Sequence, residues 1–335
     1  MDNTLLKVEN LKVMFNTDRG MVTAVNNVSY SVNKGEIVGI VGESGCGKSV
    51  MSQSILRLLE HTDLVSYSGE IYFDGLNILK LSKKELRGIR GKEISMIFQD
   101  PLTSLNPVYT VGNQIVEIIR LHEKMSRKNA KAYAMELLAD TGIMDVKRCL
   151  SLYPHELSGG MQQRVMIAMA LALEPNLLIA DEPTTALDVT IQAQILDLIA
   201  RLNRRGATVL FITHDLGVVY ELCHSVKVMY LGQIVEEGTT NELFNKPLHP
   251  YTKGLISSVP KMEGEKEEKL NTIEGTVSSL YRVPRGCKFS TRCKYASEKC
   301  IEEEPPMFFE NTQSVKCWHY KEILDSELKG EVPNV

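Results

Sequence analysis

Short apolar runs recur along the chain between polar and glycine-rich segments; one of them leads into a glycine-rich stretch and three end on polar side chains. These runs are Ile37–Val41, Ile94–Phe98, Leu177–Ala180 and Val209–Ile212. Runs of this length and composition predict buried β-strands. Ligands of open α/β sheets bind at the carboxyl ends of strands, so the polar residues that follow these runs are candidates for chemistry.

Helical and hairpin patterns fill much of the remaining chain. Helix-favouring residues recur at helical spacing over about 111–149, which predicts a helical insertion. Turn residues at 16–20 divide a β-rich stretch, so residues 5–32 predict a strand, a turn and a strand. Further predicted elements are a strand at Gly69–Phe73, a charged helix within Lys80–Lys92, a helix after Ser158, a hairpin over Val226–Val235 and a solvated linker at Lys261–Lys269.

The stretch Gly42–Ser49 reads G-x-x-x-x-G-K-S, between a predicted strand and a helix predicted from Val50 to about Leu59. This is the pattern of a phosphate-binding loop. Its glycines let backbone N–H groups turn toward phosphate oxygens, and the helix directs its positive N-terminal end at the same anion. Because Lys48 suits the β- and γ-phosphates and the Ser49 hydroxyl suits Mg²⁺, the loop predicts binding of a nucleoside triphosphate.

Other polar or aromatic positions could complete such a site. Asp181 follows a buried strand and could support Mg²⁺, and Glu182 beside it could polarise a water molecule. Gln99 could hold a metal ion or water, or could simply end its strand at a turn. His214 could contact the γ-phosphate or serve a structural role, and Phe15 could stack on a nucleobase or belong to the core.

The composition narrows the class of protein. The 335 residues are enough for two domains, and 43% hydrophobic with 24% charged residues is typical of soluble globular proteins. No apolar run approaches the ~20 residues that span a bilayer. The first residues, Met1–Thr4, lack the layout of a signal peptide, so we expect a cytoplasmic location. The net charge of −4 argues against a protein that binds nucleic acid by neutralising phosphates.

Four of the seven cysteines cluster near the C-terminus with the spacing C-x5-C-x6-C-x16-C. In a reducing cytoplasm such a cluster favours a metal site over disulfides. Structural zinc sites usually contain a closer cysteine pair, and four thiolates can hold a [4Fe–4S] cluster, so we expect an iron–sulfur cluster, with zinc as the alternative and free thiols or disulfides also open. The cysteines concerned are Cys287, Cys293, Cys300 and Cys317.

Taken together and in this order, the motifs resemble the nucleotide-binding subunit of ABC transporters over about residues 5–250. The set includes Leu157–Gly160, in which Ser158 is a good N-cap before a helix. The resemblance implies a competent ATPase in which two cassettes sandwich ATP, with this signature segment capping the nucleotide on the opposite cassette. It also implies that Glu182 is the catalytic base, that His214 is the switch histidine, and that Gln99 joins the Mg²⁺ site and senses the membrane subunits.

By the same resemblance, Ser49, Gln99 and Asp181 serve Mg²⁺, and Phe15 stacks on adenine. Asp188 resembles part of the loop that crosses the dimer interface. The implied ATP-binding residues are Phe15, Gly42, Glu43, Ser44, Gly45, Cys46, Gly47, Lys48, Ser49, Val50, Ser158, Gly159, Gly160 and Asp188.

The implied fold is α/β, with a P-loop NTPase core that carries an N-terminal antiparallel β part and a helical subdomain at about 103–165. These elements make up an ABC cassette over 1–250. A small Cys-rich domain with the four-cysteine cluster is expected over 251–335.

The C-terminal part resembles the extension of dipeptide, oligopeptide and nickel importer ATPases. It shares with them the stretch Asn245–Thr252, Cys-containing stretches at 286–293 and 300, Glu304–Pro306, and Cys317 with Trp318. Some members of this group with all four cysteines are thought to carry an iron–sulfur cluster. The resemblance implies ATP hydrolysis that powers import of dipeptides or short oligopeptides, at the cytoplasmic face of the membrane.

The implied partners are a second and different ATPase subunit, two membrane permease subunits and, indirectly, an extracytoplasmic solute-binding protein. The alternatives are import of nickel or another small solute, and a soluble ABC ATPase that does not serve transport.

Overall fold

The computed structural model describes residues 3–60, 64–184, 189–258 and 273–329. The chain forms two units, each assembled from several segments. Unit 1 consists of Met1–Leu6, Val32–Ile37 and Tyr72–Ile212, and unit 2 consists of Lys7–Ser31, Val38–Ile71 and Thr213–Val335. Asp188 and the predicted linker at Lys261–Lys269 lie outside the described residues.

Unit 1 contains a parallel group of three strands in the order β8-β7-β6. Every residue of the three strands is buried, as expected for parallel strands covered on both faces. The three apolar runs that predicted these strands are therefore confirmed. The strands are β6 (Ile94–Ile97), β7 (Leu177–Asp181) and β8 (Thr208–Ile212).

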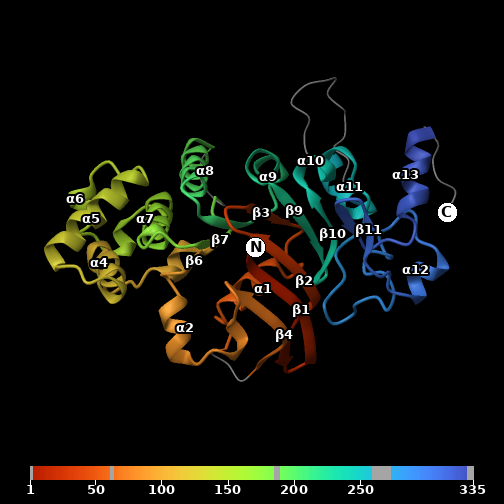
Figure 1. Ribbon diagram of the computed structural model, residues 1–335, viewed down its shortest axis with the longest axis horizontal. Helices are drawn as coiled ribbons and strands as arrows, with labels where there is room; N and C mark the ends of the chain where they lie inside the picture. The colour runs from red at the N-terminus through yellow and green to blue at the C-terminus, as the bar shows by residue number, and fades with distance from the viewer. Residues whose placement is uncertain (1–2, 61–63, 185–188, 259–272, 330–335) are drawn as a thin grey trace. The chain divides into compact units, whose positions relative to one another are not determined.

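The helices that follow β6 share a hydrophobic cluster of their own. Ile115, Leu138 and Val165 lie in this cluster, one each from α4, α5 and α7 (Figure 1). The predicted helical stretch at 111–149 is confirmed as three helices. Pro101, which follows the end of β6, begins a short helix, a first position that a proline tolerates. The helices are α3 (Pro101–Ser104), α4 (Val111–His122), α5 (Arg127–Asp140), α6 (Val146–Cys149) and α7 (Gly159–Leu171).

Unit 1 also contains further helices, a short strand and two 3-10 turns. Helix α2 begins at a capping box between Ser82 and Glu85, which confirms the charged helix predicted in this region. The additional elements are β5 (Leu76–Asn77), α2 (Lys83–Ile89), α8 (Val189–Arg204) and two 3-10 turns at Ile78–Lys80 and Pro154–Glu156.

In unit 2, the N-terminal strands confirm the strand–turn–strand prediction. Strands β1 (Thr4–Thr17) and β2 (Gly20–Asn33) are neighbours, and β4 (Val65–Phe73) lies on the other side of β1. Helix α1 (Lys48–Ile55) ends earlier than the predicted Leu59. The reason is that Arg57 adopts a left-handed conformation, with φ of 52°.

Five strands of the larger sheet lie in unit 2 and include the strand that precedes the phosphate-binding loop. Their order is β11-β12-β10-β9-β3; β3 runs parallel to β9, and the other pairs are antiparallel. The predicted hairpin is confirmed, with Gly232 at its turn in a left-handed conformation. The strands are β3 (Ile37–Val41), β9 (Ser225–Tyr230), β10 (Gln233–Thr239), β11 (Phe308–Glu310) and β12 (Gln313–Val315).

The C-terminal segment both extends this sheet and builds a small core. Strand β12 pairs with β10, with Val315 opposite Glu236. Val315 also packs with Leu248, Tyr320 and Ile323 in a compact cluster. The helices of this region are α9 (Leu216–Leu222), α10 (Thr240–Asn245), α11 (Pro250–Ser257), α12 (Glu298–Glu302) and α13 (Tyr320–Lys329).

Candidate functional site

The phosphate-binding loop of unit 2 joins β3 to α1, as the sequence predicted. Gly42 and Gly47 adopt φ values of 154° and 101°, which residues with a side chain rarely reach. A Cβ at Gly42 would strike the Met229 carbonyl oxygen, and one at Gly47 would strike the Ala24 carbonyl oxygen. Strands β2 and β9 therefore approach the loop so closely that only glycine fits at these two positions.

Lys48 lies inside this loop. It is 5% exposed, and its Nζ donates hydrogen bonds to the carbonyl oxygens of Gly42 (2.8 Å) and Glu43 (3.1 Å). The loop thus holds a buried cation at the place where the motif predicts phosphate binding. Burial raises the pKa of the neighbouring Cys46 thiol, which keeps it protonated at neutral pH. Ser49 lies in the first turn of α1.

In unit 1, the structure brings two predicted residues together at the end of β7. The amide Nε2 of Gln99 donates a hydrogen bond to Oε2 of Glu182 at 3.1 Å. Asp181, the last residue of β7, is 1% exposed and directly precedes this glutamate. Glu182 itself has φ of 47°, a left-handed conformation that strains a residue with a side chain. This end of the sheet therefore presents oxygen ligands suited to Mg²⁺ beside a positioned carboxylate.

The predicted N-cap of α7 is confirmed. The Ser158 hydroxyl accepts a hydrogen bond from the Met161 backbone N–H at 3.4 Å, and Gly159 and Gly160 form the first turn. Among the described residues, no atom beyond its chain neighbours and its own helix backbone lies within 4 Å of the place where a Cβ of Gly159 would stand, so there is open space beside this first turn. The same helix is attached to the segment after β7, because the buried Gln163 side chain donates to the Pro183 carbonyl oxygen.

His214 and Phe15 both belong to unit 2. His214 is exposed and lies between Thr213, whose N–H donates to the Ile40 carbonyl oxygen at 3.2 Å, and Asp215, the N-cap of α9. Its backbone is therefore tied to β3 on one side and to a helix start on the other. Phe15 lies on β1 and is half-buried.

The predicted nucleotide-site residues are thus divided between the units. Gln99, Ser158–Gly160, Asp181 and Glu182 lie in unit 1; Phe15, Gly42–Val50 and His214 lie in unit 2. Within unit 1, the Gln99 and Glu182 side chains are hydrogen-bonded to each other. Within unit 2, Lys48 is hydrogen-bonded to the Gly42 carbonyl oxygen at the other end of the phosphate-binding loop.

The four C-terminal cysteines line one small cavity between α11, α12 and the loops around them. All four are free thiols, and burial raises the pKa of Cys287 and Cys293 to about 11 and that of Cys317 to about 12. Among the described residues, no group of three or more His, Cys, Asp or Glu side chains has an arrangement that could hold a metal ion. The expected metal site is therefore not supported by the geometry, although the thiols share a cavity.

Sequence reasoning missed two residues that reach the phosphate-binding loop from the C-terminal segment. Arg292 forms an ion pair with Glu43, and the Tyr251 hydroxyl accepts a hydrogen bond from the Glu43 backbone N–H. No local sequence signal marks either contact, because they join positions 249 and 208 residues apart.

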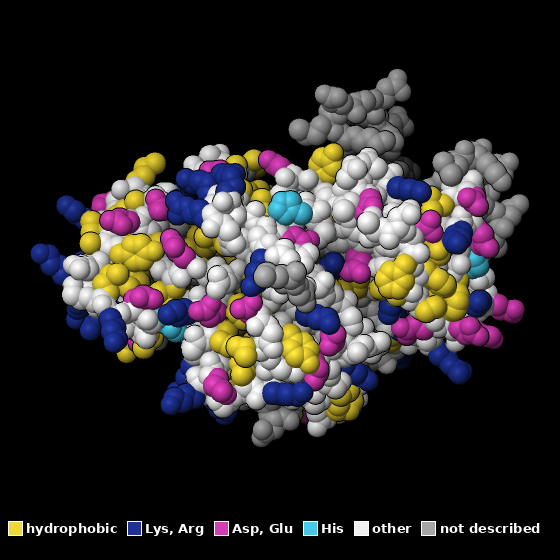
Figure 2. Space-filling model, in the orientation of Figure 1, with side chains coloured by type: hydrophobic (Ala, Val, Ile, Leu, Met, Phe, Trp, Pro, Cys, Tyr) yellow, Lys and Arg dark blue, Asp and Glu magenta, His cyan; other side chains and the backbone are white. Residues whose placement is uncertain are grey.

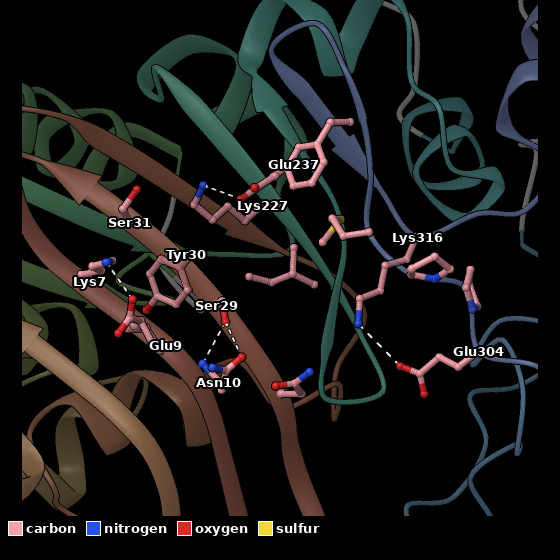
Figure 3. A pocket seen from close by; sticks show the side chains of 17 residues that line it. Lys7, Glu9, Asn10, Ser29, Tyr30, Ser31, Lys227, Glu237, Glu304 and Lys316 are labelled. Carbon is pink, nitrogen blue, oxygen red and sulfur yellow. Dashed lines mark hydrogen bonds and ion pairs between the residues drawn. The ribbon is translucent and has the colours of Figure 1, made fainter.

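A cavity of about 690 Å³ in unit 2 is lined by none of the predicted site residues (Figure 3). Its walls come from β1, β2, β9, β10 and the segment 304–316. The ion pairs along it join Lys227 to Glu237 at 2.9 Å and Lys316 to Glu304 at 3.6 Å. The described residues that line this cavity include no histidine or cysteine, the side chains that serve most often as general base and thiol nucleophile.

Two family profiles match this chain. The profile of the family described as ABC transporter matches residues 25–185. The profile described as oligopeptide/dipeptide transporter, C-terminal region, matches residues 235–300.

Two curated relatives and one solved structure are representative. The oligopeptide transport ATP-binding protein OppD of Bacillus subtilis is 52% identical over 94% of this chain and 88% of its own length. The dipeptide transport ATP-binding protein DppD of the same species is 49% identical over 94% of each chain. A dimeric ATP-binding cassette, MJ0796, in a post-hydrolysis state bound to ADP and Pi, is 31% identical with a TM-score of 0.64, and covers 70% of this chain and 99% of its own.

Proposed function

The chain belongs to the ABC transporter family of ATP-binding subunits, in the group with the oligopeptide/dipeptide transporter C-terminal region, and we propose that it hydrolyses ATP to power peptide import through separate membrane permeases. The observation that carries this proposal is the phosphate-binding loop, where two obligatory glycines and the buried Lys48 form an anion cradle. The relatives named for oligopeptide and dipeptide transport support peptides as the cargo.

Within this proposal, Glu182 is the general base that activates water for attack on the γ-phosphate. Its hydrogen bond with Gln99 supports this role, since it orients the carboxylate. Oxygen donors of Ser49, Asp181 and Gln99 would hold Mg²⁺, which neutralises charge on the phosphates during transfer. His214, exposed and fixed by its backbone, contacts the γ-phosphate or the attacking water.

The active form would be a pair of cassettes with ATP between them. The open space beside the first turn of α7 supports a role for Ser158–Gly160 in capping the nucleotide bound to the opposite cassette. Phe15 would stack on adenine, and Asp188 would contribute at the interface between cassettes. ATP closes such a pair only through a higher affinity for the closed state, and its hydrolysis removes that difference.

The proposed partners are two membrane permease subunits, a second and different ATPase subunit and, indirectly, an extracytoplasmic binding protein, with this chain at the cytoplasmic face. In the described part of the chain, no helix is long and apolar enough to cross a membrane. Hydrophobic side chains reach the surface over α4 to α6 (Figure 2), and Leu121 and Met144 are highly exposed there. Such a surface supports docking onto another subunit.

A first experiment tests ATP hydrolysis. Glu182→Gln should lower Mg²⁺-dependent turnover by roughly 10²- to 10⁴-fold while ATP binding is kept, because only the proton acceptor is lost. Glu136→Gln, on an exposed position of α5, is the matched control and should hydrolyse ATP like the wild type. Turnover retained in Glu182→Gln would reject this glutamate as the base.

A second experiment tests cargo and partners. Cells that lack the chain should lose uptake of a labelled oligopeptide, and uptake should return with the wild type but not with Glu182→Gln. Loss of nickel uptake with peptide uptake intact would instead make the chain a nickel importer subunit. Co-purification with membrane proteins supports transport, whereas capture of nucleic acid would indicate a soluble ABC ATPase.

We also propose that the four C-terminal cysteines hold a [4Fe–4S] cluster, with Zn²⁺ as the alternative. Their shared cavity and free thiols support this assignment, and metal binding would have to displace protons from thiols whose pKa is raised by burial. Anaerobically purified protein should be brown, with about four irons per chain. Cys293→Ser should lose the iron, whereas Cys149→Ser in α6 should keep it. One zinc per chain without iron would establish the alternative, and neither metal would refute both.

The domain limits proposed from the sequence are 1–250, with a helical part at about 103–165, and 251–335. Two separate hydrophobic clusters support them, one shared by α4, α5 and α7 and one in the C-terminal segment. Limited proteolysis should cut first near residue 260, and the two fragments, one ending and one beginning near 260, should stay associated through the pairing of β10 with β12.

A further inference from the structure

The phosphate-binding loop contains a carboxylate that is paired with a distant arginine. The guanidinium of Arg292 donates from Nη1 to Oε2 of Glu43 at 2.6 Å and from Nη2 to Oε1 at 3.1 Å. The Arg292 side chain is 3% exposed and the Glu43 side chain is 29% exposed. Two parallel charge-assisted bonds of this kind fix the carboxylate in both position and orientation.

The position of Arg292 is determined by its own surroundings in the C-terminal segment. Its Nε donates to the Glu274 carbonyl oxygen at 2.9 Å, and Nη2 also donates to the Ile273 carbonyl oxygen at 3.2 Å. The guanidinium lies 5.9 Å from the centre of the Phe289 ring. The C-terminal segment therefore fixes the position of Arg292, and Arg292 in turn fixes the position of the Glu43 carboxylate.

Tyr251 makes a second contact with the same residue. Its hydroxyl accepts a hydrogen bond from the Glu43 backbone N–H at 2.8 Å. The tyrosine is fully buried, and its ring packs against Tyr230 and Phe289 with centroid distances of 4.7 and 5.4 Å. Both the side chain and the backbone N–H of Glu43 are thus held by residues of the C-terminal half of the chain.

A carboxylate in a loop that binds phosphate is unfavourable by itself, because like charges repel at short range. We propose that Arg292 is a positioning residue for ATP binding: it neutralises Glu43 and, together with Tyr251, holds the first turn of the phosphate-binding loop. The C-terminal segment thereby sets the affinity of the loop for ATP. This inference rests on the proposed function, since it assumes that the loop binds ATP.

The test compares ATP dissociation constants, measured calorimetrically on the purified full-length chain, with turnover at saturating ATP. Arg292→Met should raise the Kd for ATP by about tenfold, equivalent to about 1.4 kcal/mol. Turnover at saturating ATP should change less than Kd, because the catalytic carboxylate is untouched. Glu43→Gln combined with Arg292→Met should recover most of the lost affinity, since the unpaired charge is then removed.

Lys288→Met is the matched control. Lys288 belongs to the same segment and forms an ion pair with Glu304 at 2.9 Å, with side-chain exposures of 9% and 36%. Its Nζ otherwise donates to carbonyl oxygens at 284–286, and among the described residues none of these partners belongs to the loop. The control variant should lower thermal stability to a similar degree while keeping Kd within about twofold of the wild type. If Arg292→Met fails to fold, Arg292→Lys keeps the charge, loses the fork geometry and should raise Kd by a smaller factor.

Three results would overturn the inference: an unchanged Kd in Arg292→Met, an equal loss of affinity in Lys288→Met, or no recovery when Glu43→Gln is added. Wild-type protein that binds no ATP would refute the proposed function instead.

Discussion

Glu182 has a left-handed backbone conformation, so replacing it with glycine should relieve backbone strain while ATP hydrolysis is lost. A residue with a side chain at φ of 47° carries a cost of about 1–2 kcal/mol, which glycine does not have. Glycine loses about 0.5–1 kcal/mol more than alanine in conformational entropy on folding. Glu182→Gly should therefore be about 0.5–1 kcal/mol more stable than Glu182→Ala. The lost hydrogen bond to Gln99 is common to both variants and cancels in this comparison.

The assay is urea unfolding of both variants, with ATP hydrolysis measured on the same samples. Both should lose roughly 10²- to 10⁴-fold in turnover. The control pair lies at Glu136 in α5, where the backbone is helical. There the order should reverse, with Glu136→Gly less stable than Glu136→Ala by about 1 kcal/mol. If Glu182→Gly proves less stable than Glu182→Ala, the backbone at this position is not strained and the reasoning fails.

Three further predictions concern the loop, the strand ends and the sheet. Gly47→Ala should abolish ATP binding because its Cβ meets backbone, whereas Gly206→Ala, also left-handed but with open space around it, should bind ATP normally in the same calorimetric titration. Gln99→Ala should lower turnover about tenfold, because the Glu182 carboxylate loses the hydrogen bond that orients it. ATP affinity should change little, and steady-state kinetics can separate the two effects. Burial raises the pKa of Glu236 from 4.5 to about 7. Its contribution to the free energy of unfolding is therefore full below pH 4.5 and falls by about 3 kcal/mol as the pH rises through 7. The difference in urea-unfolding free energy between the wild type and Glu236→Gln should show this slope at pH 5–8, and a flat difference would contradict it.

The elements that the sequence predicted well are those specified by local pattern. Strands β3, β7 and β8 come from uninterrupted apolar runs, and the start of α7 comes from the Ser158 cap. Element ends were less certain. Arg57 is a good helix former by intrinsic preference, and yet it takes the left-handed conformation that ends α1. Pro101 both ends an extended segment and begins a helix, and pattern alone supports either outcome.

The candidate site was predictable where a motif specifies backbone geometry, as at Gly42 and Gly47. The contacts of Arg292 and Tyr251 with Glu43 were not, because they depend on long-range packing that no local periodicity encodes. The attachment of Gln163 to Pro183 is of the same kind. The spacing of the cysteines likewise could not show whether the thiols adopt a geometry suited to a metal, since spacing along the chain does not determine distance in space.

The pairing of β12 with β10 has a consequence for any shortened form of the protein. Val315 and Ser314 cover the side of β10 at Glu236 and Glu237, and the Lys316 N–H donates to the Val235 carbonyl oxygen at 2.8 Å. A chain truncated before β12 would expose the unpaired backbone edge of β10, which is a template for self-association. The extension therefore protects the edge of β10 from pairing with other molecules, and its deletion should yield aggregates rather than a soluble minimal cassette. A shortened chain would stay soluble only if another segment paired with β10 in place of β12.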